Sequence, residues 1–295
     1  MNGRKAMNPL SEASAPLSYA GRHITLLTQH GKEIAIAPVL EPAIGCRIER
    51  VAGYDTDLLG TFTREIPRFG TQLDAARKKA RIGMEMAGSR LGLASEGSFG
   101  HDPYTGMFSW NVEVLLFIDD TLEIEVCGIY QGPDNSEHLH TNDWAAVEAF
   151  ADKAGFPAQH LVLRPNDERD SRFRKGIADG LSLRDAFSWA QGLSNAGKVF
   201  VEFDLRAYAN PTRMENIRHA AEDLATKLAS VCPACSTPGY ALVDQLTGLR
   251  CAVCGVPTRE PRADIWGCVR CNHRETRTRK DAVAADPGRC DRCNP

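Results

Sequence analysis

Four Cys-x-x-Cys pairs in the last 65 residues constrain the fold more than any other feature of the chain. Each such turn directs two thiolates at one ion, and two turns complete a tetrahedral Zn²⁺ site. Eight cysteines therefore predict two structural zinc ions, because four thiolates leave no open position for catalysis. The predicted ligands are Cys232, Cys235, Cys251, Cys254, Cys268, Cys271, Cys290 and Cys293.

Four pairs can combine into two sites in three ways. We expect sequential pairing, first with second and third with fourth, because the intervening segments of 15 and 18 residues have the length of a zinc ribbon. A crossed arrangement is the alternative. Either way, residues 231–295 are predicted to form a tandem zinc-ribbon module with four cysteines per site, which is too short and too polar to fold without metal.

Cysteines at metal-ligand spacing are typical of a reducing compartment, so a cytoplasmic location is expected. The sequence has neither a run of about 18 apolar residues nor a secretory start, so no membrane segment is expected. Residues 1–20, rich in Ser, Ala and Pro, are predicted to form a disordered tail. Residues 21–230 then remain for one α/β core domain.

Strand and helix patterns alternate along this core and predict a mixed sheet flanked by helices. Residues 107–118 are apolar enough for a strand at the centre of the sheet. Thr71 and Asp74 form a capping-box pattern, and Gly88 ends the helix that follows. The polar face of that helix carries Arg77, Lys78, Lys79 and Arg81, predicted to be either solvated or, for one or two of them, phosphate-facing. Asn210 and Pro211 predict the start of another long helix.

Two segments of the core are candidates for a functional site. Thr28 to Lys32 follows the first predicted strand, and a hydroxyl, backbone amides and an ammonium can together hold a phosphate. The apolar run at residues 91–94 is predicted to break at a glycine-flanked turn that carries Glu96. Glu96 is the expected reactive carboxylate, since α/β sheets usually bind ligands where their strands end.

The order of these features resembles the house-cleaning nucleoside triphosphate pyrophosphatases, which include the inosine/xanthosine triphosphatases. The resemblance rests on the Thr28–Lys32 loop, Glu65 before the basic helix, and Glu96–Gly97 followed by Phe108, Ser109 and Trp110. It implies a pyrophosphatase-like fold and Mg²⁺-dependent hydrolysis of a nucleotide. Thr28 and Lys32 would hold phosphate, while Glu96, Asp102 and Glu65 would be the catalytic or Mg²⁺-binding carboxylates.

The chain as a whole, cysteine tail included, resembles an uncharacterised bacterial family known only as a domain of unknown function. A second hypothesis is therefore a non-catalytic adaptor, in which the zinc ribbons bind nucleic acid or a protein partner. The basic run of Arg274, Arg277, Arg279 and Lys280 would contribute. Its charge is local, because acidic residues and zinc-bound thiolates offset it across the module.

Overall fold

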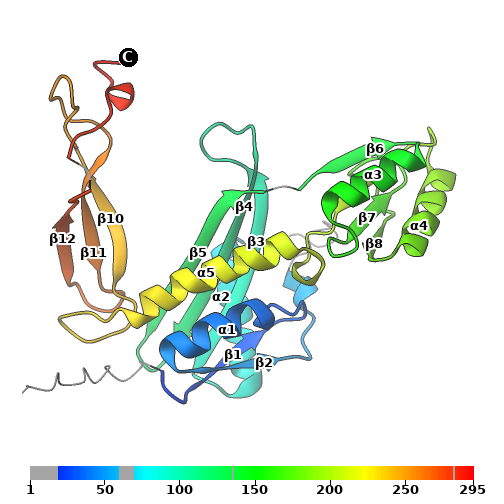
Figure 1. The fold of residues 1–295 in the computed structure, drawn as a ribbon. Helices are drawn as coiled ribbons and strands as arrows, with labels where there is room; N and C mark the ends of the chain where they lie inside the picture. The colour runs from blue at the N-terminus through cyan, green and yellow to red at the C-terminus, as the bar shows by residue number, and fades with distance from the viewer. Residues whose placement is uncertain (1–18, 60–69, 135, 282) are drawn as a thin grey trace, which may run out of the picture.

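The structure is a computed structural model that describes residues 19–59, 70–134, 136–281 and 283–295. Glu65 and residues 1–18 of the expected tail lie outside these ranges. Three sheets follow one another across the molecule, with the C-terminal sheet at one end and the smaller α/β unit at the other (Figure 1).

The first sheet has the strand order β2-β1-β3-β4-β5. Its strands are β1 (His23–Leu27), β2 (Arg47–Val51), β3 (Leu91–His101), β4 (Ser109–Asp119) and β5 (Ile124–Pro133). β1 is parallel to both β2 and β3, whereas β3, β4 and β5 are antiparallel. The expected mixed sheet is confirmed.

Helices cover both faces of this sheet, which explains why its central strands are apolar on both sides. α1 (Glu33–Ile44) and α5 (Pro211–Ala229) pack over one face together with Leu93 and Phe117. α2 (Gln72–Ala87) packs over the other, against Ala94 and Leu116. Successive strand residues thus alternate between the two cores.

The predicted ends of two helices are confirmed. The Thr71 side chain caps α2 in a capping box with Asp74, and Gly88 ends that helix in the left-handed conformation at φ 61°. Asn210 caps α5 by accepting a hydrogen bond from the Arg213 amide, with Pro211 in the first turn. Both ends position residues of the buried site described below.

The turn predicted around Glu96 is wrong. β3 runs unbroken from Leu91 to His101, and Glu96 pairs with Val114 of β4. Gly97, one of the residues that suggested a turn, serves packing instead, because a Cβ there would overlap the Arg213 and Glu113 side chains.

A second sheet lies between β5 and α5 in the chain, with the order β6-β9-β7-β8. It has its own hydrophobic cluster, so residues 21–230 contain two sheets with separate cores. Its elements are β6 (His138–Thr141), α3 (Trp144–Ala154), β7 (Leu161–Arg164), β8 (Arg174–Ile177), α4 (Gly180–Leu193) and β9 (Val199–Phe203).

The third sheet is formed by β10 (Ala241–Thr247), β11 (Pro261–Gly267) and β12 (Arg274–Thr278), all antiparallel. It projects from the end of α5 as an arm (Figure 1). Short 3₁₀ helices complete the fold: η1 (Thr56–Leu59), η2 (Ala207–Ala209) and η3 (Pro287–Arg289). Within the described ranges, no helix combines the length and apolar character needed to cross a membrane.

Candidate metal centres and a buried ion-pair network

The eight cysteines of the arm gather into two groups of four. One contains Cys232, Cys235, Cys268 and Cys271, and the other contains Cys251, Cys254, Cys290 and Cys293. Within each group, all ligand atoms lie within 4.8 Å of one another. The predicted ligand set therefore forms two four-cysteine clusters.

The expected sequential pairing is wrong, and the crossed pairing is observed. A zinc ribbon that closes on itself needs a hairpin between its two Cys-x-x-Cys turns, to bring the second turn back beside the first. Only one strand, β10, separates the first turn from the second, and β11 alone separates the second from the third. Each strand thus carries the chain to the opposite end of the sheet, so alternate turns meet.

The geometry of both clusters fits zinc. A tetrahedral ion with Zn–S bonds of 2.3 Å requires sulfur atoms about 3.8 Å apart. The Sγ–Sγ distances are 3.8 Å for Cys232–Cys271 and 3.6 Å for Cys235–Cys268. In the other cluster, they are 3.9 Å for Cys251–Cys293 and 3.6 Å for Cys254–Cys290. These separations are far longer than the roughly 2.05 Å of a disulfide.

Crossed pairing predicts zinc contents that sequential pairing does not. Replacing Cys235 and Cys268 with serine removes ligands from one cluster, so one zinc per chain should remain after dialysis against a weak chelator. Replacing Cys235 and Cys251 affects both clusters, and both ions should be lost. Elemental analysis of the two purified variants distinguishes the two pairings. Sequential pairing would leave no zinc in the first variant and one zinc in the second.

The first Cys-x-x-Cys turn is anchored to the core. Gly239, at φ 96°, donates its amide to the Lys227 and Ser230 carbonyls at the end of α5. A Cβ at Gly239 would lie 2.7 Å from Val126 of β5 and 3.2 Å from Val269. Close backbone approach therefore holds the nearer four-cysteine cluster against the first sheet.

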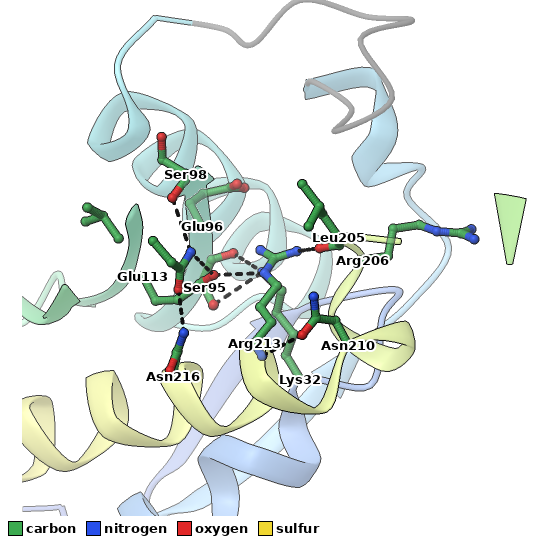
Figure 2. A network of polar contacts seen from close by, with 12 residues as sticks. Lys32, Ser95, Glu96, Ser98, Glu113, Leu205, Arg206, Asn210, Arg213 and Asn216 are labelled. Carbon is green, nitrogen blue, oxygen red and sulfur yellow. Dashed lines mark hydrogen bonds and ion pairs between the residues drawn. The ribbon is translucent and has the colours of Figure 1, made fainter. Parts of the chain in front are cut away.

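A second site lies at the end of β1. Beyond this point, β3 has no neighbouring strand on the β1 side. Lys32, at the start of α1, extends its side chain into this gap and is only 5% exposed. Its Nζ donates to the Ser95 carbonyl at 2.7 Å and to the Ser95 hydroxyl at 3.2 Å (Figure 2). The predicted phosphate-loop lysine therefore contacts the residue that precedes Glu96.

On the α2 face of β3, the Glu96 carboxylate forms an ion pair with Lys79. Burial, together with the nearby charges of Arg213 and Lys79, lowers the pKa of Lys32 to about 7. For Glu96, burial acts to raise the pKa, but Lys79 and Lys32 lower it overall. Lys32 and Glu96 thus influence each other across the edge of β3.

On the opposite face of β3, Arg213 of α5 and Glu113 of β4 form a buried ion pair. Arg213 Nε donates to Glu113 Oε1 at 2.8 Å, and the two side chains are 1% and 0% exposed. Asn111 donates to the same carboxylate oxygen at 3.2 Å and accepts from Asn216 at 2.9 Å. Figure 2 shows this network joining α5 to β4 and to the Leu205 carbonyl.

This network explains why residue 97 is glycine. An alanine Cβ there would overlap the Arg213 guanidinium and the Glu113 carboxylate. We expect Gly97→Ala to destabilise the first sheet by about 1 to 3 kcal/mol through overpacking. Gly100→Ala, on the same strand with open space around the new methyl, is the matched control. Calorimetry should show a lowered melting transition for Gly97→Ala alone, and equal melting of both variants would contradict this explanation.

The structure places the other predicted site residues elsewhere. The Thr28 hydroxyl is buried and accepts from the His30 amide at 3.3 Å. Asp102 lies six residues beyond Glu96, in the β3–β4 connection, where its carboxylate accepts from four loop amides and the Thr105 hydroxyl. These bonds hold the pKa of Asp102 well below its usual range. Asp102 therefore shapes the loop and does not join Glu96.

Sequence reasoning missed several members of the network. The basic face of α2 is divided: Arg77 pairs with Glu125, Arg81 with Asp120 and Lys79 with Glu96. Glu113 carries a usable signal, because it is a carboxylate inside β4 that directly precedes the apolar run from Val114 to Ile118. Its partner Arg213 lies 100 residues away, and no local pattern identifies it.

The family model described as a domain of unknown function (DUF6671) matches residues 79–295. The chain belongs to the DUF6671 family. The match spans Lys79, Glu96, Glu113, Arg213 and both four-cysteine clusters, and it begins after β1 and α1. No curated protein matches the chain.

Membership in DUF6671 confirms the expected family of unknown function. The comparisons do not show a bacterial origin or a similarity to nucleoside triphosphate pyrophosphatases. Lys32 and Thr28 lie outside the matched range. The candidate site therefore combines residues of the DUF6671 domain with residues of the segment that precedes it.

Proposed function

We propose that the first sheet of this DUF6671 protein binds the phosphates of a nucleotide where β1 ends, and hydrolyses a nucleoside triphosphate there. The observation that carries the proposal is the position of Lys32. Its ammonium is buried against Ser95 and electrostatically coupled to Glu96. The location also supports the proposal, since the carboxyl ends of parallel strands are the usual ligand sites of α/β sheets.

The charge of the site favours an anion. Three basic side chains, Lys32, Lys79 and Arg213, surround β3, and two acidic ones, Glu96 and Glu113, oppose them. The side chains of Lys79 and Glu96 are 12% and 13% exposed, whereas the Arg213–Glu113 pair is fully enclosed. A ligand would thus approach on the α2 face, and phosphate oxygens would take the place of Glu96 beside Lys79.

The described residues do not form the Mg²⁺ site that the resemblance implies. Glu96 is paired with Lys79, Asp102 is occupied by its own loop, and Glu65 lies outside the described residues. Beyond the two cysteine clusters, the described chain contains no group of three His, Cys, Asp or Glu side chains close enough to hold an ion.

The residues present nevertheless suit hydrolysis at a phosphorus atom. Water would attack the α-phosphorus, the bond to the oxygen bridging the β-phosphate would break, and pyrophosphate and a nucleoside monophosphate would leave. Glu96, freed from Lys79 by the bound phosphates, would accept the proton from the water. Lys32 and Lys79 would offset the charge of the triphosphate.

Turnover tests this proposal. The full-length protein is incubated with a panel of nucleoside triphosphates, with and without Mg²⁺, and released pyrophosphate is measured. We expect Glu96→Gln and Lys32→Met each to reduce the rate at least 100-fold. Glu148→Gln and Lys153→Met, which change exposed side chains of α3, should retain it. Absence of pyrophosphate release from every nucleotide would refute the hydrolase.

A further inference from the structure

We propose that the C-terminal arm, residues 231–295, binds an acidic segment of another protein at the end that lies away from the first sheet. This segment would carry aliphatic residues among its carboxylates. The proposal is independent of the phosphate site on the first sheet. It gives the adaptor hypothesis a location and a ligand class, and it rests on a hollow beside the second Cys-x-x-Cys turn.

This hollow is a cavity of about 470 Å³ lined by Gly248, Leu249, Arg250, Pro257, Arg262 and Val283. It combines two guanidinium groups with an aliphatic lining. Two apolar side chains of the same end of the arm face solvent, with Val253 74% exposed and Val283 92% exposed. Exposed aliphatic side chains next to arginines are typical of a surface that contacts a partner.

The two arginines of the hollow are held in place by backbone carbonyls. Arg250 Nη1 donates to the Gly255 carbonyl at 2.9 Å, and Arg262 Nε donates to the Thr247 carbonyl at 3.2 Å. Each guanidinium has five N–H donors, so each keeps others to offer to a ligand. A carboxylate suits such a guanidinium because two parallel hydrogen bonds can form.

Carboxylates of the arm neutralise other arginines at this end, but not these two. Arg259 pairs with Asp291 at 3.2 Å, Arg279 with Asp281 at 2.7 Å and Arg289 with Glu260 at 2.9 Å. Among the described residues, Arg250 and Arg262 form no ion pair. Their charges are therefore uncompensated at the hollow and complementary to an acidic partner.

The lining favours a peptide over a nucleic acid. Single-stranded nucleic acids are commonly held by aromatic side chains on which the bases stack, and the hollow has none. The aromatic residues of the described arm, Tyr240 and Trp266, pack together towards the core end, where Arg277 lies over both rings. Leu249, Pro257 and Val283 are better suited to contact the aliphatic side chains of an acidic peptide than the bases of a nucleic acid.

Fluorescence anisotropy of the full-length, zinc-loaded protein tests the assignment. The probe is a labelled twelve-residue peptide of Asp and Leu, compared with the same peptide carrying Asn in place of Asp and with a twelve-nucleotide oligo(dT). We expect Arg250→Gln/Arg262→Gln to weaken binding of the acidic peptide at least tenfold. Arg22→Gln/Arg270→Gln removes two exposed arginines that do not line the hollow and form no ion pair with the described residues, and it should change binding less than twofold.

Both double variants must first be shown to carry two zinc ions per chain, so that a folding defect is not mistaken for a lost site. Equal weakening by both variants, or equal binding of the Asn peptide, would overturn the proposal. Tighter binding of oligo(dT) with the same dependence on Arg250 and Arg262 would replace the acidic peptide with a nucleic acid.

Discussion

Removing zinc is expected to unfold residues 231–295 while the two larger sheets stay folded. The buried apolar residues described in this arm are few, and half of them are ligands: Cys232, Tyr240, Cys251, Ala263, Ala285 and Cys290. A core this small cannot offset the entropy lost on folding. Metal binding must supply the difference, and a structural Zn²⁺ site contributes about 10 to 16 kcal/mol.

Limited trypsin digestion measures this effect. After chelation, cleavage at Arg262 and Arg277 within the strands of the arm should accelerate at least tenfold, and added Zn²⁺ should restore protection. Cleavage at Arg184, in α4 of the second sheet, serves as the internal control and should not change. Elemental analysis should first establish that both ions are gone. If the arm then remains as protected from trypsin as before, the structural role of zinc is contradicted.

Breaking the buried Arg213–Glu113 pair is expected to be the most damaging single change in the core. Arg213→Met leaves the Glu113 carboxyl group without its ion-pair partner at 0% exposure, and removal of one partner of such a pair costs about 3 to 5 kcal/mol. Arg213→Met/Glu113→Gln removes both charges, so it should recover part of that loss. Arg218→Met, on the same helix but paired with exposed Glu215 and Glu222, should cost less than about 1 kcal/mol.

Hydrogen exchange followed by mass spectrometry is the suitable measurement, because it reports the local stability of β4 and α5 in a chain with several cores. Exchange of β4 peptides should accelerate strongly in Arg213→Met, less in the double variant and little in Arg218→Met. Similar exchange in Arg213→Met and Arg218→Met would show that the ion pair contributes no more than a surface pair.

Features set by neighbouring residues could be predicted from the sequence, and features set by distant contacts could not. The caps of α2 and α5 depend on side chains within four positions, and both predictions hold. The cysteine ligands follow from their spacing, but their pairing depends on how many strands separate the turns. Glycines near Glu96 suggested a turn, whereas Gly97 is required by Arg213, which lies far away in the chain.

The candidate site shows the same division. The loop with Lys32 and the strand with Glu96 could be proposed because each carries its own local pattern. Their contact through Ser95 depends on parallel pairing of β1 with β3 and on β1 ending early. The role of Asp102 in its loop and the selection of Lys79 from a basic helix face depend on side-chain positions that only the fold determines.

The central claim, that phosphate binds beside Lys32, is tested most directly by calorimetric titration with a nonhydrolysable α,β-methylene nucleoside triphosphate at several pH values. Because the pKa of Lys32 is lowered to about 7 in the free protein, a bound anion should raise it and cause proton uptake. The affinity of the unchanged protein should fall as the pH rises from about 6 to 8.5, relative to Lys32→Met. Lys32→Met should bind at least tenfold more weakly at pH 6, while Lys153→Met binds normally. Equal affinity of Lys32→Met and the unchanged protein at every pH would contradict the claim.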